Sequence, residues 1–421
     1  MKRYITAAVA GLSLFAAAGF VAAADEPVIR LVNAHWWAGD HFVSGERYLK
    51  GGVFVRRTRA DRTVDLGGAW VTPPFGEAHN HNLDAPALAR GVSDTYLANG
   101  IFYVKNPNSR FANTPATRAL LGKQDTVDAV FAMGGITGTG GHPIRLYGFL
   151  SRWPGPVRDG ETFEGDAFHL VNREADIAPV LDTLQAQGAD FIKTYLLHSE
   201  RFDARNGQKA FYGQTGLDPK LYPLVVRAAH ARGLRVSVHI ESAADFRVAV
   251  AAGVDEINHL PGYMWDKEDT PEAYRLTPAD AKAAARAGVV VVSTTVVTDQ
   301  INVSAERKTA IRALQAANLK TLRAGGVKIA LGSDSFMTTA RAEARNLIAI
   351  GAFDGPTVLK LWIDTAPTTI FPDRRIGCLN VGCEADFLVL GADPLADFSA
   401  TANIHQAWKD GRTLTLAPPQ S

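Results

Sequence analysis

Two histidines, His79 and His81, stand two positions apart directly after an apolar, extended segment at residues 71–75. In an extended chain, side chains at positions i and i+2 point to the same side, so both imidazoles can reach one ion. Neutral imidazole is a good ligand for zinc and similar metals. Taken alone this pair is a weak signal, and two polar loop residues are the alternative interpretation.

A lysine lies inside a second apolar segment. Lys193 is part of the strand-like run 190–196, where a charged amine is costly unless it is paired or its pKa falls. One interpretation is a buried ion pair, for example with Asp334. The other is a deprotonated amine that captures carbon dioxide, because the resulting carbamate has one negative charge and two oxygens that can bridge two cations.

Three further polar residues close strand-like segments later in the chain. His239 follows residues 236–238, His259 follows residues 256–258, and Asp334 follows residues 329–333. A lone histidine at a strand end is commonly a hydrogen-bonded structural residue, but two on successive strands favour a second metal ion. Asp334 either caps the helix after it or binds metal and transfers a proton.

The elements that must position these residues alternate between strand-like and helix-like segments. Apolar spacing and terminal glycines predict helices at residues 220–232, 278–287 and 305–324. The expected strands cover residues 69–73, 101–105, 129–133, 190–196, 235–240, 256–260, 289–296 and 328–332. This alternation predicts an α/β fold, a (β/α)8 TIM-like barrel, rather than an open sheet with a Gly-rich phosphate turn. The candidate ligands then all lie at the C-terminal ends of strands, where the active sites of such barrels assemble.

Both ends of the chain contain short β-prone runs separated by glycines. We expect them to pair into one small β-sandwich domain of residues 25–72 and 377–421, beside a barrel of residues 73–376. Cys378 and Cys383 flank a tight strand–turn–strand in the second of these regions. A disulfide and two small buried thiols remain alternatives, because sequence spacing does not establish the Cα separation.

Residues 1–24 have the layout of a cleavable secretory signal, with Lys2 and Arg3 before an apolar stretch and small residues at its end. A permanent membrane anchor is the alternative. No later segment approaches the roughly 20 apolar residues that span a bilayer, so we expect no membrane association after cleavage. We therefore expect a secreted protein, most simply in a bacterial periplasm. With 44 basic and 43 acidic residues the chain is nearly neutral, which argues against a nucleic-acid partner.

As an ordered set, these motifs resemble the amidohydrolase superfamily, in the imidazolonepropionase-like branch that includes metal-dependent dipeptidases. The resemblance extends from about residue 28 to residue 416. It rests on the segment FGEAHNH at 75–81, the strand lysine, the two later histidines, GSD at 332–334, and tail segments at 365–367, 375–377 and 384–390.

The resemblance implies a binuclear centre of two divalent ions, most simply zinc. It assigns one ion to His79, His81 and Asp334, and the other to His239 and His259, with a carboxylated Lys193 as the bridge. In the implied mechanism, a hydroxide shared by ions about 3.5–4 Å apart attacks a carbonyl carbon. Asp334 then passes a proton to the leaving nitrogen.

The substrate is less well defined by the sequence. His142 is similar to a GGH segment that the peptidase branch uses near substrate, and a structural loop residue is the alternative. We expect Tyr103, Lys105, Tyr195 and Tyr263 to contact substrate together with His142. Lys105, Arg145 and Arg201 are each candidates to bind a substrate carboxylate, and the sequence does not rank them.

Three departures from the family pattern concern the substrate rather than the metals. Glu77 stands where relatives commonly have Asp, Lys105 and Asn106 stand in place of Arg-Asp, and no Gly-Gly pair follows Lys193. We expect a hydrolase that cleaves an amide or peptide-like C–N bond of a small molecule. A mononuclear deaminase, a cyclic-amide or lactone hydrolase, and a non-catalytic exported metal-binding protein are the alternatives. The oligomeric state stays open, with a homo-oligomer among the options.

Overall fold

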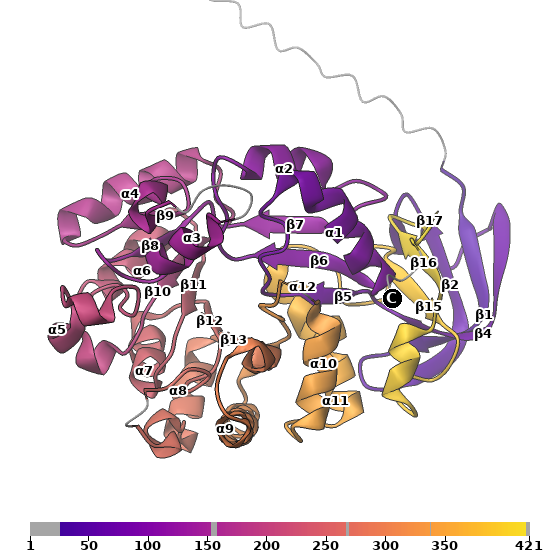
Figure 1. Cartoon of the computed structure of the whole chain (residues 1–421). Coiled ribbons are helices and arrows are strands. Elements are labelled where there is room, and N and C mark those ends of the chain that lie inside the picture. Colours follow the sequence, from indigo (N-terminus) through magenta and orange to yellow (C-terminus); the bar gives the residue numbers. More distant parts are fainter. Residues whose placement is uncertain (1–25, 153–157, 267–268, 337, 418–421) are drawn as a thin grey trace, which may run out of the picture.

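The computed structural model describes residues 26–152, 158–266, 269–336 and 338–417, so the expected signal at residues 1–24 lies outside the described residues. Figure 1 shows a sheet built from both chain ends beside a larger body of strands and helices. The predicted fold class, a (β/α)8 TIM-like barrel with a small β-sandwich domain from both chain ends, is confirmed. Along these described ranges, no helix is both long and apolar enough to cross a bilayer.

The barrel strands are parallel and form two ladders. The first ladder runs in the order β5 (Phe75–Glu77), β6 (Ile101–Asn106) and β7 (Asp128–Phe131). The second has the order β14 (Lys328–Ala330), β13 (Val290–Val292), β12 (Glu256–Asn258), β11 (Val236–His239), β10 (Ile192–Tyr195), β8 (Gly135–Thr137) and β9 (Phe168–Leu170). Ala78 N donates to Leu331 O at 2.8 Å, which joins the chain after β5 to the chain after β14.

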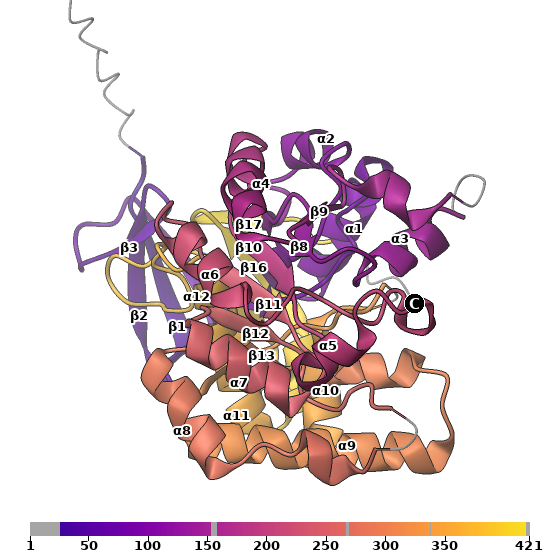
Figure 2. The same ribbon diagram turned by 90° about the vertical axis from the view of Figure 1, so that its left-hand side faces the viewer.

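Helices follow most of the barrel strands and lie outside them (Figures 1 and 2). They are α1 (Pro86–Ala98), α2 (Thr114–Leu120), α3 (Ile144–Leu150), α4 (Glu174–Ala186), α5 (Phe202–Arg205), α6 (Tyr222–His230), α7 (Ala243–Ala252), α8 (Pro278–Ala287), α9 (Ala305–Ala324), α10 (Ala340–Ala349), α11 (Gly355–Lys360) and α12 (Ala366–Ile370). The predicted bounds of α8 and α9 are confirmed residue for residue. The prediction for α6 was too long at both ends.

The two chain ends share one seven-stranded ladder. Its order is β17 (Arg412–Leu414), β16 (Ile404–Lys409), β15 (Phe387–Leu390), β4 (Arg62–Thr72), β1 (Ile29–Trp37), β2 (Phe42–Lys50) and β3 (Val53–Val55). The ladder curls so that its edge strand β3 comes close to the central strand β15. The ring centroids of Phe54 in β3 and Phe387 in β15 are 5.9 Å apart. Phe54 N also donates to Cys383 O at 2.9 Å. Buried aromatic rings therefore fill the interior of a sandwich-like domain.

The prediction of residues 69–73 as the first barrel strand is wrong. Residues 69–72 belong to the long strand β4, where Trp70 and Val71 pair with β15 and β1 of the terminal sheet. The first barrel strand is the short β5, which begins at Phe75, after Pro73 and Pro74. Proline cannot donate to a ladder, so the pair of prolines separates the two sheets.

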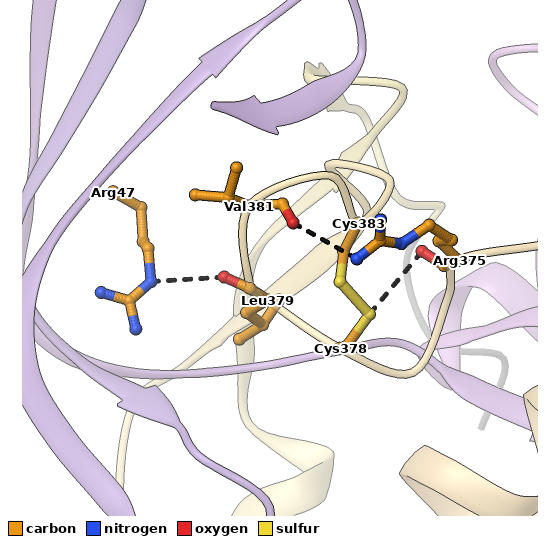
Figure 3. Close-up of a disulfide and its surroundings, with 6 residues drawn as sticks. All are labelled: Arg47, Arg375, Cys378, Leu379, Val381 and Cys383. Carbon is orange, nitrogen blue, oxygen red and sulfur yellow. Dashed lines mark hydrogen bonds between the residues drawn. A yellow bond between two sulfur atoms is a disulfide. The ribbon is translucent and has the colours of Figure 1, made fainter. Parts of the chain in front are cut away.

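A disulfide closes the turn before β15. Cys378 and Cys383 are bonded, with their Cα atoms 6.0 Å apart, which decides the alternative left open by the sequence (Figure 3). Arg47 Nε donates to Leu379 O inside the closed loop at 3.3 Å, so the loop is attached to strand β2. The disulfide therefore stabilises the junction between the two halves of the terminal domain.

Candidate metal centre

The six predicted ligands line one cavity of about 210 Å³ at the C-terminal ends of the barrel strands. The cavity is lined by His79, His81, Asp84, Asn108, His142, Pro143, Leu146, Tyr147, Leu150, Lys193, Tyr195, His239, His259, Tyr263, Val297, Asp334 and Phe336. The six predicted ligands, which are up to 255 positions apart in sequence, therefore meet at one end of the barrel, as expected for this fold.

His79, His81 and Asp334 form the tightest group. Their candidate ligand atoms all lie within 4.8 Å of one another. The Nε2 atoms of His79 and His81 lie 3.6 and 3.3 Å from the same Asp334 oxygen, Oδ1. His79 is almost fully buried, and its Nδ1 has no hydrogen-bond partner among the described residues. Burial lowers the pKa of His79, so the imidazole is neutral and can act as a ligand.

Backbone contacts fix Asp334 against the first strand. Asp334 N donates to His79 O at 2.8 Å, and Asp334 adopts a left-handed backbone with φ of 47°. A non-glycine residue in this region is strained and persists only where its surroundings hold it. Gly332 permits the close approach, because a Cβ there would lie 2.6 Å from the His79 Cβ.

The buried carboxyl of Glu77 binds the same turn through hydrogen bonds. Its carboxyl oxygens accept hydrogen bonds from Ser333 N at 2.7 Å, Ser333 Oγ at 3.0 Å and Ala340 N at 2.5 Å. Burial raises the pKa of Glu77 to about 8, although these hydrogen bonds act in the opposite direction. Glu77 is therefore a buried positioning residue for the Asp334 turn.

Lys193 points into the cavity and is only 1% exposed. Its Nζ donates to Asn258 Oδ1 at 2.5 Å. Burial lowers the pKa of Lys193 to about 7, while the negative charges of Asp334 and Glu256 act to raise it. A substantial fraction of the amine is then unprotonated at neutral pH, which is the form that reacts with carbon dioxide.

His239 and His259 lie beside Lys193 on the next two strands. Their ring centroids are 4.5 Å apart. His259 Nδ1 lies 2.7 Å from Thr294 Oγ1 and 3.8 Å from Asp334 Oδ2, so Asp334 faces both groups of histidines. Burial lowers the pKa of His259 as well, which keeps this imidazole neutral.

Aromatic and imidazole rings complete the wall around His239. His142 stacks on His239 with ring centroids 4.9 Å apart and planes 17° apart, and Tyr195 lies 5.1 Å from His142. Tyr263 OH lies 3.4 Å from His239 Nε2. Burial lowers the pKa of His142 to about 3, so the ring is neutral at physiological pH and one of its nitrogens carries a hydrogen to donate.

The model of the amidohydrolase family matches residues 184–415, which is more than half of the chain. The chain belongs to the amidohydrolase family. Membership makes it a hydrolase that acts on amide or peptide-like bonds, and it confirms the resemblance found in the sequence. No curated protein matches it significantly.

Solved structures share the fold of this amidohydrolase at low sequence identity. The structure of A. niger ochratoxinase matches with a TM-score of 0.72 and 16% identity, covering 94% of this chain and 98% of that one. A prolidase complexed with N-methylphosphonate-L-proline matches with a TM-score of 0.69 and 18% identity, covering 93% and 100%. Molinate hydrolase matches with a TM-score of 0.69 and 15% identity, covering 94% and 98%.

Two residues expected to contact substrate lie elsewhere in the amidohydrolase. Tyr103 is fully buried, and its OH donates to Asp386 Oδ2 of the terminal domain at 2.7 Å. Lys105 Nζ donates to the buried Glu256 Oε2 at 2.8 Å. The structure brings neither of them to the cavity, because each side chain is bound by a carboxylate in the interior. Tyr195, Tyr263 and His142 do line the cavity, as expected.

The sequence interpretation missed several polar residues of the cavity and its surroundings. Asn258 and Glu256 alternate along β12, a polar pattern inside an apolar barrel strand that could have identified Asn258 as a partner for Lys193. Asp84, Asn108 and Tyr147 come from loops and helix α3. Their positions depend on contacts such as Asn108 Nδ2 to Tyr147 OH at 2.7 Å, which carry no local sequence signal.

Proposed function

We propose that this amidohydrolase is a binuclear metal enzyme that hydrolyses an amide or peptide-like C–N bond of a small molecule. The observation that carries the proposal is the close group of His79, His81 and Asp334 facing the buried Lys193 across one cavity. His239 and His259, with a carboxylated Lys193 as the bridge, would hold the second ion. Zinc is the expected metal, because neutral imidazole and carboxylate oxygen are both ligands for it.

The geometry of the first group fits a metal ion. Zinc bonds to nitrogen and oxygen of about 2.0–2.2 Å at tetrahedral angles place neighbouring ligand atoms roughly 3.3–3.5 Å apart. The two Nε2 to Oδ1 distances are 3.3 and 3.6 Å. These contacts are at or beyond the usual length of a direct hydrogen bond, and they leave space for a cation between the three side chains.

The surroundings of Lys193 fit a carbamate. When the amine forms a carbamate, its nitrogen loses charge but keeps one hydrogen, and Asn258 Oδ1 is positioned to accept it. The close partner of Nζ here is a neutral amide oxygen rather than a carboxylate, so this contact does not require a charged amine. The neutral partner therefore supports the modified form.

The bound ions would lower the pKa of an attacking water and polarise the substrate carbonyl. Asp334, which faces both groups of histidines, would take the proton of that water and deliver it to the leaving nitrogen. His142 would donate a hydrogen bond to the carbonyl oxygen as negative charge develops there. Because its ring is neutral, it can be buried beside the substrate without the desolvation cost of a charged imidazolium. Tyr195 and Tyr263 would orient the substrate against this wall.

We also propose that the chain is exported and that residues 1–24 are its signal, most simply for a bacterial periplasm. The Cys378–Cys383 disulfide supports this location, because disulfides persist in oxidising compartments. We further propose two domains: a terminal domain of residues 25–72 and 377–421, and a barrel of residues 73–376. The boundary at 72/73 is supported by the end of β4 at Thr72 and the start of β5 at Phe75.

Metal content and turnover of two variants test the proposed function. Asp334→Asn should keep metal while turnover falls by roughly 10²–10⁴-fold, because a proton-transfer group is lost. Lys193→Ala should lose metal and activity, and a short carboxylic acid should restore part of both by replacing the bridge. Full activity in Asp334→Asn would refute its assigned role. One ion per chain with an unmodified lysine, measured by mass spectrometry, would favour the mononuclear alternative.

A further inference from the structure

Outside the proposed ligands, the described residues that line the cavity include no lysine or arginine, and the outer part of the wall is largely apolar. Lys193 is the only lysine or arginine among the described residues that line the cavity. Asp84 and Asp334 are its carboxyl groups, and both accept rather than donate hydrogen bonds when ionised. Five apolar residues line the outer wall beside neutral polar side chains. The apolar residues are Pro143, Leu146, Leu150, Val297 and Phe336, and the neutral polar ones are Asn108, His142, Tyr147, Tyr195 and Tyr263.

None of the three cations that the sequence offered for a substrate carboxylate lines the cavity. Lys105 is buried against Glu256 at 2.8 Å. Arg201 donates to Asp266 at 2.5 Å and to Asp269 at 2.6 Å. Burying a carboxylate against the apolar part of this wall is unfavourable unless a cation pairs with it, and no described lysine or arginine other than Lys193 lines the cavity.

Arg145 faces away from the cavity. It lines a separate, shallow surface depression together with Asp159, Glu161 and Lys209. Arg145 belongs to helix α3, and the neighbouring Leu146 of the same helix lines the cavity instead. Helix α3 therefore presents its apolar side to the cavity and its cation to a different surface.

The apolar wall continues to the mouth of the cavity. Leu146 is 37% exposed and Phe336 is 49% exposed, so part of each side chain is in contact with water in the free protein. Covering such side chains with an apolar group is favourable, because it removes apolar surface from water. The mouth therefore favours an apolar substituent on the substrate.

We infer that the substrate of this amidohydrolase is an amide, carbamate or urea that is uncharged near the scissile bond and carries an aryl or branched alkyl group against Leu146 and Phe336. This inference rests on the proposed function and specifies its substrate class. It excludes small amino-acid and dipeptide substrates with a free carboxylate next to the bond. With one water consumed, an amide would release an amine and an apolar carboxylic acid, a carbamate would release an amine, carbon dioxide and an alcohol, and a urea would release two amines and carbon dioxide.

Matched pairs of substrates test the inference. In each pair a carboxylic acid next to the scissile amide is compared with its primary amide: N-phenylacetylglycine with N-phenylacetylglycinamide, and N-phenylacetylalanine with N-phenylacetylalaninamide, with released phenylacetate as the readout. We expect kcat/KM of the metal-loaded enzyme to be at least tenfold higher for the neutral member of each pair. Equal or higher values for the acids would overturn the inference.

Arginine substitutions test whether the missing cation on the cavity wall causes the preference for uncharged substrates. Leu146→Arg should raise kcat/KM for the acids relative to their amides by about tenfold, because it adds the missing cation. Leu120→Arg is the matched control, since Leu120 is equally exposed at 38% but does not line the cavity, and its ratio should stay that of the wild type. If Leu146→Arg does not fold, Phe336→Arg serves the same purpose. A folded variant at either position with an unchanged ratio would overturn the inference.

Binding measurements separate this inference from the proposed function. If no pair is hydrolysed, metal content and the Asp334 and Lys193 variants decide the proposed function, and calorimetry with the same compounds and the metal-loaded protein decides the substrate class. Tighter binding of the amides would support the apolar, uncharged site even without turnover. Equal or tighter binding of the acids would overturn it.

Discussion

Lys193 Nζ donates a hydrogen bond to Asn258 Oδ1, 2.5 Å away, in the buried interior of the barrel. Asn258 is itself held by two neighbours: its Nδ2 donates to Glu256 Oε1 at 2.8 Å, and its Oδ1 lies 2.8 Å from Ser237 Oγ. Glu256 in turn pairs with Lys105. A polar chain therefore runs from the proposed metal bridge into the barrel core, and it ends on a buried ion pair.

Replacing Asn258 should weaken the proposed bridge without removing a ligand. We expect Asn258→Ala to lower metal affinity or turnover by roughly 10–100-fold, as is typical for partners of metal ligands. Metal titration followed by elemental analysis would measure the loss. Asn318→Ala is the control, because Asn318 is also buried but binds Leu276 N and Tyr274 O away from the cavity. Equal metal loss in both variants would mean that Asn258 acts only through stability.

Removing the Glu77 carboxyl should loosen the Asp334 turn. Glu77→Ala leaves Ser333 N, Ser333 Oγ and Ala340 N without their acceptor, and each buried orphan costs about 1–3 kcal/mol. We expect the free energy of unfolding in urea to fall by about 3 kcal/mol or more, together with metal affinity at the first site. Glu77→Gln keeps one acceptor oxygen and should lose less. A Glu77→Ala protein with wild-type stability would contradict this role.

The buried Asp386 should make stability depend on pH. Burial raises its pKa from 3.8 to about 6, although bonds from Tyr103 OH and Asp410 N act in the opposite direction. A raised folded-state pKa means that the folded protein binds this proton more tightly than the unfolded chain. The contribution is therefore fully present below about pH 4 and is lost as pH rises through about 6.

The variant Asp386→Asn isolates this contribution. Asparagine resembles the protonated acid, so the two proteins should have similar free energies of unfolding near pH 4. At pH 7 the variant should be more stable by up to about 3 kcal/mol, which corresponds to a shift of roughly two pKa units. Urea titrations at pH 4, 5, 6 and 7 would measure the difference. A difference that does not change with pH would exclude Asp386 as its source.

The Cys378–Cys383 bond should stabilise the terminal domain without affecting the cavity. The two cysteines are five positions apart. Closing so short a loop lowers the entropy of the unfolded chain, which raises the free energy of unfolding by about 2 kcal/mol at 25 °C. We expect the double variant Cys378→Ser, Cys383→Ser to lose this amount in urea unfolding while it keeps its metal content and turnover. Loss of turnover in the folded variant would link the junction between the domains to the active site.

Much of the local structure could be predicted from the sequence. Helix α8 has the bounds expected of it, because Thr277 and Asp280 form a capping box at its start and Gly288 adopts a left-handed conformation at its end. The strand-end positions of His239 and His259 followed from short apolar runs that stop at a polar residue. Such signals lie within a few residues of the element they define, so they need no knowledge of the fold.

Tertiary structure alone decided which polar groups meet. Lys105, which we expected to contact substrate, is paired with Glu256, 151 positions away. Residues 69–72 belong to the terminal sheet because residues 70–72 pair with β15. Arg145 and Leu146 are neighbours in sequence, yet the turn of α3 sends one to the surface and the other to the cavity. The residue types that can bind metal are determined by the sequence, whereas their partners and the uncharged wall depend on long-range packing, which no local pattern encodes.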